Sequence, residues 1–131
     1  MHFLQGSVQH YAWGTTEAIP ELLRRQPDGT PHAEYWLGTH PQGPARVGEL
    51  TLERLIAGDP SLLGESVRGA FGDELPFLMK VLSARHALSI QAHPSRAQAE
   101  EGYARENEAG VPLDSPERVY SDPWPKPEIL I

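Results

Sequence analysis

The sequence predicts a mainly β fold of short strands with inserted helices. Thirteen prolines and twelve glycines divide the 131 residues into short pieces, which suits strands joined by ordered loops better than a helical bundle. Leu88–His93 alternates apolar and polar side chains strictly, and Lys126–Ile131 alternates in a similar way, as half-buried strands do. A chain of this length buries enough surface for one core. We therefore expect residues 1–131 to form a single domain.

The N-terminal half contains one predicted strand and several helix starts. Phe3–Tyr11 has the composition of a strand. A short helix is expected over Pro20–Arg25, because proline suits the first helical turn. Thr51 is a predicted N-cap for a helix over Leu52–Ala57, and the Asp-Pro pair at 59–60 is expected to open a further helical turn.

The second half carries the clearest local signals. Pro76–Ala84 is a nearly continuous apolar run, which fits a buried strand or a buried helix segment, and the β-rich run after it favours the strand. Ser95 and Gln98 have the spacing of a capping box. They predict a helix over Arg96–Glu108 that ends at Gly110, since glycine commonly terminates helices.

Composition excludes several classes of protein. The chain has no cysteine, so a bound metal needs imidazole, carboxylate or amide ligands. The net charge of −7 and the lack of a basic block argue against nucleic-acid binding. The sequence has no apolar run of membrane-spanning length, and Met1–Gln5 does not resemble the start of a signal peptide. We therefore expect no membrane partner and a soluble, cytoplasmic protein.

Three side chains form a candidate metal-binding set. Gln91 and His93 are two residues apart on a predicted strand, so they share one face with Cα atoms roughly 6 to 7 Å apart. Glu128 adds a carboxylate from the second alternating stretch. One nitrogen and two oxygen ligands suit Zn²⁺ or another divalent ion and leave coordination positions open for substrate or water. The alternative is that all three belong to ordinary solvated strand faces.

The two lysines form a second candidate set. Only Lys80 and Lys126 are lysine among eleven basic residues, and both lie in the segments just described. A lysine within an apolar run is costly unless it is paired or binds an anion, and its compact charge suits a phosphate or proton chemistry. The alternative is that both side chains extend to the surface.

Four ordered blocks of the sequence resemble type I mannose-6-phosphate isomerases and span nearly the whole chain. The blocks are Tyr11–Gly14, Ala33–Pro41, the pair Leu75–Ser83 and Leu88–Pro94, and Lys126–Glu128. The Ser-Ile-Gln-Ala-His-Pro string at 89–94 is intact. One local departure is Trp124-Pro125 before Lys126, where the family often has Asn-His.

The resemblance implies a cupin-like β-barrel (jelly roll) with inserted helices and a zinc-dependent aldose-ketose isomerase. Its substrates would be mannose 6-phosphate and fructose 6-phosphate, interconverted through a cis-enediol. By the same resemblance, Gln91, His93 and Glu128 are zinc ligands, while Ser89 and Lys80 contact the sugar phosphate. Lys126 is the candidate for proton transfer.

The family's fourth zinc ligand, a histidine, comes from a later segment than Ile131. We therefore expect an incomplete barrel that binds zinc more weakly than a longer chain would and shows little or no isomerase activity. We also expect it to self-associate through exposed strand edges such as Glu128–Ile131, or to need a partner chain.

Further residues receive weaker predictions. We expect Trp13 and Trp36 to be core residues rather than a substrate platform, and Glu34 and His40 to support the metal site without binding the ion. The remaining histidines have no partner spacing and are predicted to be surface or structural residues; they are His2, His10, His32 and His86.

Two rival functions remain open. One is a non-catalytic cupin module that binds metal or sugar phosphate. The other is a cupin oxygenase that uses two histidines and a carboxylate with Fe(II). The absence of a second histidine paired with His93 on its strand argues against the oxygenase.

Overall fold

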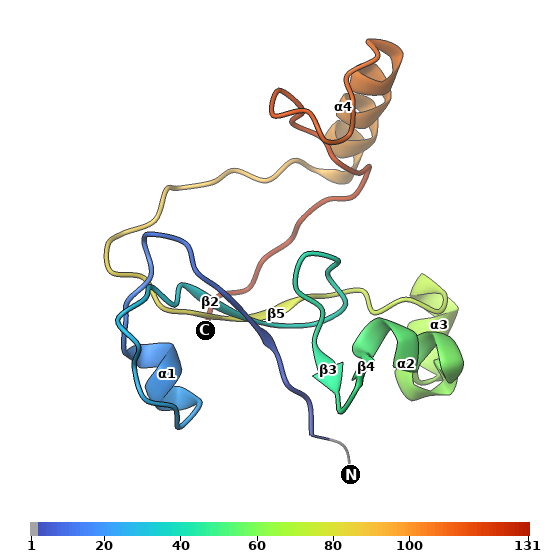
Figure 1. Ribbon diagram of the computed structural model, residues 1–131. Helices are drawn as coiled ribbons and strands as arrows, with labels where there is room; N and C mark the ends of the chain where they lie inside the picture. Colours follow the sequence, from blue (N-terminus) through green and yellow to red (C-terminus); the bar gives the residue numbers. More distant parts are fainter. Residues whose placement is uncertain (1–2) are drawn as a thin grey trace. The chain divides into compact units, whose positions relative to one another are not determined.

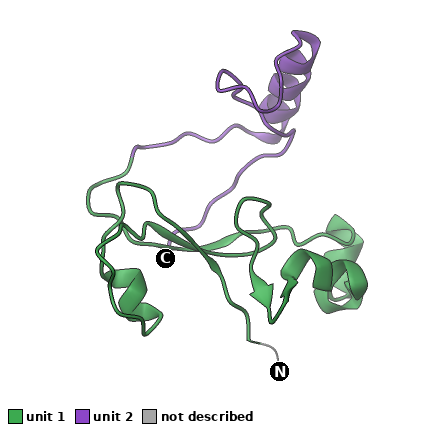
Figure 2. Ribbon diagram, in the orientation of Figure 1, with its two compact units in different colours: residues 1–88 green, residues 89–131 purple. Residues whose placement is uncertain are grey.

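The computed structural model describes residues 3–131 (Figure 1). The chain divides into two compact units, residues 1–88 and residues 89–131 (Figure 2). The prediction for His2 falls outside the described residues. Within residues 3–131, no helix is both long enough and apolar enough to cross a membrane.

An antiparallel sheet of three strands, in the order β1-β2-β5, organises unit 1. The strands are β1 (Ser7–Gln9), β2 (Glu34–Leu37) and β5 (Met79–Leu82). In the central strand, Tyr35 lies opposite Val8 on one side and Val81 on the other. β1 and β5 lie inside the predicted strands Phe3–Tyr11 and Pro76–Ala84 but are shorter, because pairing with β2 covers only part of each stretch.

Buried and half-buried side chains alternate along β2, as the period of a strand requires. Trp36 is 5% exposed and Glu34 is 8% exposed, so the core role predicted for Trp36 is confirmed. Gly6 permits close packing here, since a Cβ at that position would lie 2.4 Å from the Trp36 carbonyl oxygen. The buried carboxylate of Glu34 therefore sits directly beside the core.

A two-stranded sheet and four short helices complete unit 1. They are α1 (Ala18–Leu22), β3 (Arg46–Val47), β4 (Leu50–Thr51), α2 (Leu52–Gly58), the 3-10 helix η1 (Pro60–Leu63) and α3 (Glu65–Phe71). The predicted cap is confirmed, because Thr51 Oγ1 accepts a bond from the Arg54 N–H at 3.4 Å. The predicted helix at Pro20 in fact begins two residues earlier. No signal in the sequence predicted α3.

Unit 2 contains one long helix, α4 (Arg96–Glu108). Its capping box is formed as predicted: Ser95 Oγ accepts from the Gln98 N–H, and the Gln98 side chain accepts from the Ser95 N–H at 2.9 Å. Gly110 follows the helix with a φ of 71°, a conformation that glycine adopts without strain.

Two predicted strands are absent, and these predictions were wrong. Neither Leu88–His93 nor Lys126–Ile131 is in a strand. Within residues 3–131 neither segment has a partner strand, and a strand is stable only when its backbone groups are paired. Apolar side chains of both segments are exposed to solvent, with Ile90 103% and Ile129 90% exposed.

The structure supports the predicted mixture of strands and helices, with less β structure than expected. No strand within residues 3–131 exceeds four residues, whereas α4 alone has thirteen. Both sheets are open in the described part of the chain. The cupin-like barrel therefore stays a proposal.

Candidate metal centre

His93 and Glu128 meet in unit 2 although 34 residues separate them in the sequence. His93 lies just before the capping box of α4, where Pro94 keeps the chain extended. The Nε2 atom of His93 is 3.3 Å from the Oε2 atom of Glu128. The side chain of His93 is 28% exposed and that of Glu128 is 70% exposed, so both atoms can reach an ion from solvent.

The separation of these two atoms fits a shared zinc ion. Two ligands about 2.1 Å from a tetrahedral zinc ion are roughly 3.4 Å apart. A nitrogen and a carboxylate oxygen are also ligands that zinc accepts. Within residues 3–131 no group of three or more His, Asp or Glu side chains could hold a metal. Gln91, the third residue of the predicted set, carries an amide oxygen, which is a ligand type outside that group.

A cavity of about 620 Å³ lies beside this pair, within unit 2. Gln91 and His93 line one part of it, which brings two predicted ligands together without a strand. The segment from Val119 to Asp122, together with Trp124 and Lys126, lines another part. Imidazole, amide, carboxylate and ammonium groups thus face one space of the size of ordinary ligand sites.

Lys126 is positioned beside Asp122 at the cavity. Its Nζ atom is 4.0 Å from Asp122 Oδ2, and both side chains are about half exposed. The other oxygen of Asp122, Oδ1, accepts from the Trp124 N–H at 3.0 Å and so orders the turn that leads to Lys126. The structure thus places an ammonium group in the wall of the cavity that Gln91 and His93 also line.

Lys80 belongs to β5 in unit 1 and is held by buried groups there. Its Nζ atom is 3.3 Å from Glu34 Oε2 and 4.9 Å from the centre of a Trp36 ring. Trp36 Nε1 also donates to Glu34, and the His40 ring packs edge-on against Trp36 with centroids 4.8 Å apart. Lys80 is thus paired, as a lysine within an apolar run needs to be.

Other predicted site residues have less support. Ser89 is exposed and does not line the cavity, because the strand that was to aim it there is absent. Glu34 contacts Lys80, and His40 packs against Trp36, so both lie in unit 1 near the first of the two lysines. Trp13 is half-buried and stacks on Tyr11, and His86 is exposed as predicted.

The sequence did not reveal Tyr120, Asp122 or Trp124 as cavity residues. In the sequence, Trp124 stands out only because it departs from the family motif. Asp122 before Pro123 is a common turn signal, and it could have indicated that this segment folds back before Lys126. Nothing in the sequence pattern indicated Tyr120.

The side chains of Gln91, His93, Asp122 and Lys126 line one cavity and so bring an amide, an imidazole, a carboxylate and an ammonium group to a candidate metal-binding site. The family model for the phosphomannose isomerase type I catalytic domain matches residues 1–131. The chain belongs to this family.

Relatives and solved structures agree with this assignment. The chain is 48% identical to mannose-6-phosphate isomerase of Escherichia coli over 99% of its length, and 37% identical to the human enzyme over 98%. It is similar to the Salmonella typhimurium isomerase structure bound to fructose 6-phosphate and zinc, with a TM-score of 0.84 at 44% identity over 94% of the chain. The chain spans 35% of the E. coli relative, 31% of the human one and 32% of that structure.

Proposed function

We propose that this chain is the metal-binding catalytic segment of a zinc-dependent mannose-6-phosphate isomerase. It would interconvert mannose 6-phosphate and fructose 6-phosphate. The observation that carries the proposal is the 3.3 Å approach of His93 Nε2 to Glu128 Oε2 beside a cavity that Gln91 and Lys126 also line. The zinc and the sugar phosphate of the similar Salmonella typhimurium structure supply the chemistry to test.

The proposed zinc site uses His93, Glu128 and Gln91. A bound zinc ion would polarise the oxygens of the sugar on which charge develops. His93 and Glu128 supply the ligand atoms whose spacing is already right, and Gln91 faces the same cavity. The alternative to zinc is another divalent first-row ion, which the same ligand types also accept.

The chain's own groups can carry the proton chemistry. Isomerisation through a cis-enediol moves a proton between two adjacent carbons, which requires a base placed over that pair. Lys126 lines the cavity and is our candidate for that base or for an electrostatic assistant to it. Lys80, a paired ammonium in unit 1, is our candidate for a phosphate contact, with Ser89 as a second candidate.

Fold, domain and location are part of the same proposal. We propose that residues 1–131 form a single catalytic segment of a cupin-like barrel, on the strength of the family match to residues 1–131. A cytoplasmic location and self-association through Glu128–Ile131 stay predictions. Although this segment is not a strand, the exposed side chains of Ile129, Leu130 and Ile131 are apolar, as a self-associating surface would need.

A coupled assay for fructose 6-phosphate tests the proposal directly. Zinc is added to or withheld from the chain, with mannose 6-phosphate as substrate. Turnover that depends on zinc supports the isomerase. Zinc or phosphosugar binding without turnover supports the rival, a non-catalytic module, and no binding of either ligand contradicts both.

A further inference from the structure

Arg118 is a buried guanidinium that the proposed chemistry does not use. Its side chain is 2% exposed, although an arginine is rarely buried unless its charge and its donors are satisfied. It lies 5.0 Å from the centre of the Tyr103 ring. Burial of an arginine side chain costs free energy, so we expect Arg118 to have a structural or functional role.

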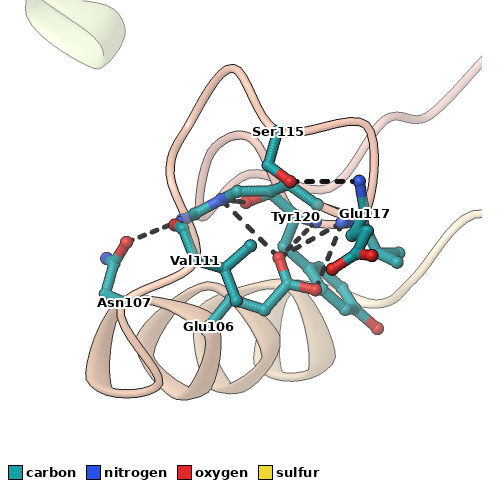
Figure 3. A network of polar contacts seen from close by, with 8 residues as sticks. Glu106, Asn107, Val111, Ser115, Glu117 and Tyr120 are labelled. Atoms are coloured by element: carbon teal, nitrogen blue, oxygen red, sulfur yellow. Dashed lines mark hydrogen bonds and ion pairs between the residues drawn. The ribbon is translucent and has the colours of Figure 1, made fainter.

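The donors of Arg118 join the loop after α4 to the helix. Nη1 donates to the Val111 carbonyl at 2.6 Å and Nε to the Tyr120 carbonyl at 2.8 Å, so both ends of the loop Val111–Tyr120 are tied. Nη2 donates to Asn107 Oδ1 on α4 at 2.7 Å (Figure 3). The planar guanidinium group thus donates three hydrogen bonds in three directions, as the fixed arrangement of its N–H groups allows.

Glu106 completes this connection from the helix side. Its Oε2 accepts from the Tyr120 N–H at 2.9 Å, and both carboxylate oxygens lie 3.2 Å from the Val119 nitrogen (Figure 3). The carboxylate is also 3.6 Å from Arg118 Nε. The bond from the Tyr120 N–H, with a further bond from Val119, holds the pKa of Glu106 below its ordinary value.

The residues fixed in this way belong to the cavity wall. Val119 and Tyr120 line the cavity beside the candidate metal centre, and the chain then continues through Asp122 and Trp124 to Lys126. Gly102 on α4 allows the Tyr120 ring to pack closely against the helix, because a Cβ there would lie 2.5 Å from that ring. The Tyr120 backbone is therefore held at both its N–H and its carbonyl.

We propose that Arg118 and Glu106 are positioning residues that hold the Val119–Asp122 wall against α4 and thereby set the cavity for its ligand. The inference rests on the proposed function, since it takes the cavity as the zinc and sugar-phosphate site. Neither side chain lines the cavity. Their effect passes through Tyr120 and the turn that carries Lys126.

The experiment measures Zn²⁺ affinity by calorimetry together with amide hydrogen exchange at Val119 and Tyr120. The variants are Arg118→Lys, which keeps the charge but loses the fork, and Glu106→Gln, which keeps the size but loses the charge. Both should expose the two amides to exchange and weaken Zn²⁺ binding by about tenfold, as loss of supporting contacts around a metal site does. Asn107→Ala removes one acceptor and should give a smaller loss of the same kind, should the stronger variants fail to fold.

Matched controls separate this role from general stability. Arg68→Lys alters an arginine-carboxylate pair in unit 1 that is about half exposed, and Glu108→Gln neutralises an exposed carboxylate at the end of α4. Both should leave Zn²⁺ affinity and the Val119 and Tyr120 amides unchanged.

The outcomes distinguish this inference from the proposed function. Loss of amide protection in Arg118→Lys and Glu106→Gln with wild-type Zn²⁺ affinity would show that the contacts only stabilise the loop, and would overturn the inference while the zinc site stands. A wild-type chain whose Zn²⁺ binding is absent, or is unaffected by His93→Ala, would overturn the proposed function and the inference with it.

Discussion

At the scale of single residues, the candidate metal centre depends most on His93. It is the nitrogen ligand of the proposed set, and the other two ligands are oxygens, which hold first-row ions more weakly. The His93–Glu128 contact joins segments that are otherwise linked through α4 and the loop after it. A change at this one side chain therefore tests the site without altering the helix.

We predict that His93→Ala removes Zn²⁺ binding, measured as metal content after purification in the presence of zinc. His86→Ala is the control, because His86 is exposed and belongs to unit 1. It should retain the metal content of the wild type. Unchanged zinc in His93→Ala would remove the site as described.

Substitution of the two lysines should change different kinetic parameters, wherever turnover is measurable. Lys126→Ala should lower kcat by about 100-fold or more, as expected for loss of a proton-transfer group. Lys80→Ala should chiefly raise KM, because a phosphate contact is made in both ground state and transition state. The opposite pattern would exchange the two roles.

At the scale of elements, the sequence correctly predicted the features that depend on residues close together in the chain. Thr51 capped α2 and the Ser95–Gln98 box capped α4 because each signal involves residues three positions apart. The strand predicted at Leu88–His93 does not form. Alternation of apolar and polar side chains indicates which face of a strand would be buried, but it provides no partner strand. Ligand type and the family resemblance both grouped Gln91, His93 and Glu128 in the sequence analysis. The Arg118–Glu106 contacts had no sequence signal because they depend on how the loop folds back.

Two helical glycines should respond in opposite ways to alanine. Gly69 in α3 has nothing within 4 Å of a built Cβ, so Gly69→Ala should stabilise the chain by roughly 0.5–1 kcal/mol through helix propensity. Gly102→Ala in α4 should destabilise it, because its Cβ would overlap the Tyr120 ring at 2.5 Å. Urea unfolding of both variants measures this, and equal effects would contradict the packing of Tyr120 on α4.

The contact between α4 and the loop should weaken in acid. The pKa of Glu106 is lowered, chiefly by the bond from the Tyr120 N–H. The ionised carboxylate therefore contributes stability that is present above its unfolded pKa and is lost as pH falls through the lowered folded pKa. Amide exchange at Tyr120, corrected for the intrinsic pH dependence, should rise over this acid range in the wild type. Glu106→Gln should abolish that rise, and a rise of equal size in the variant would assign the effect to another group.

At the scale of the whole molecule, the candidate residues are distributed unequally between the two units. All three proposed zinc ligands and Lys126 lie in residues 89–131, whereas Lys80, Glu34 and Trp36 lie in residues 1–88. Zinc bound through the three proposed ligands would therefore contact residues 89–131.

Zinc should accordingly protect the two units to different degrees. A ligand that binds only the folded state stabilises it by about 2.7 kcal/mol at a free concentration 100 times its Kd. Since the proposed ligands lie in residues 89–131, added Zn²⁺ should slow amide exchange first in α4 and the loop Val111–Tyr120. The amides of β1, β2 and β5 should change little. Hydrogen exchange followed by mass spectrometry, with His93→Ala as the control, measures this difference, and protection that appears first in the three-stranded sheet would place the zinc site in unit 1 instead.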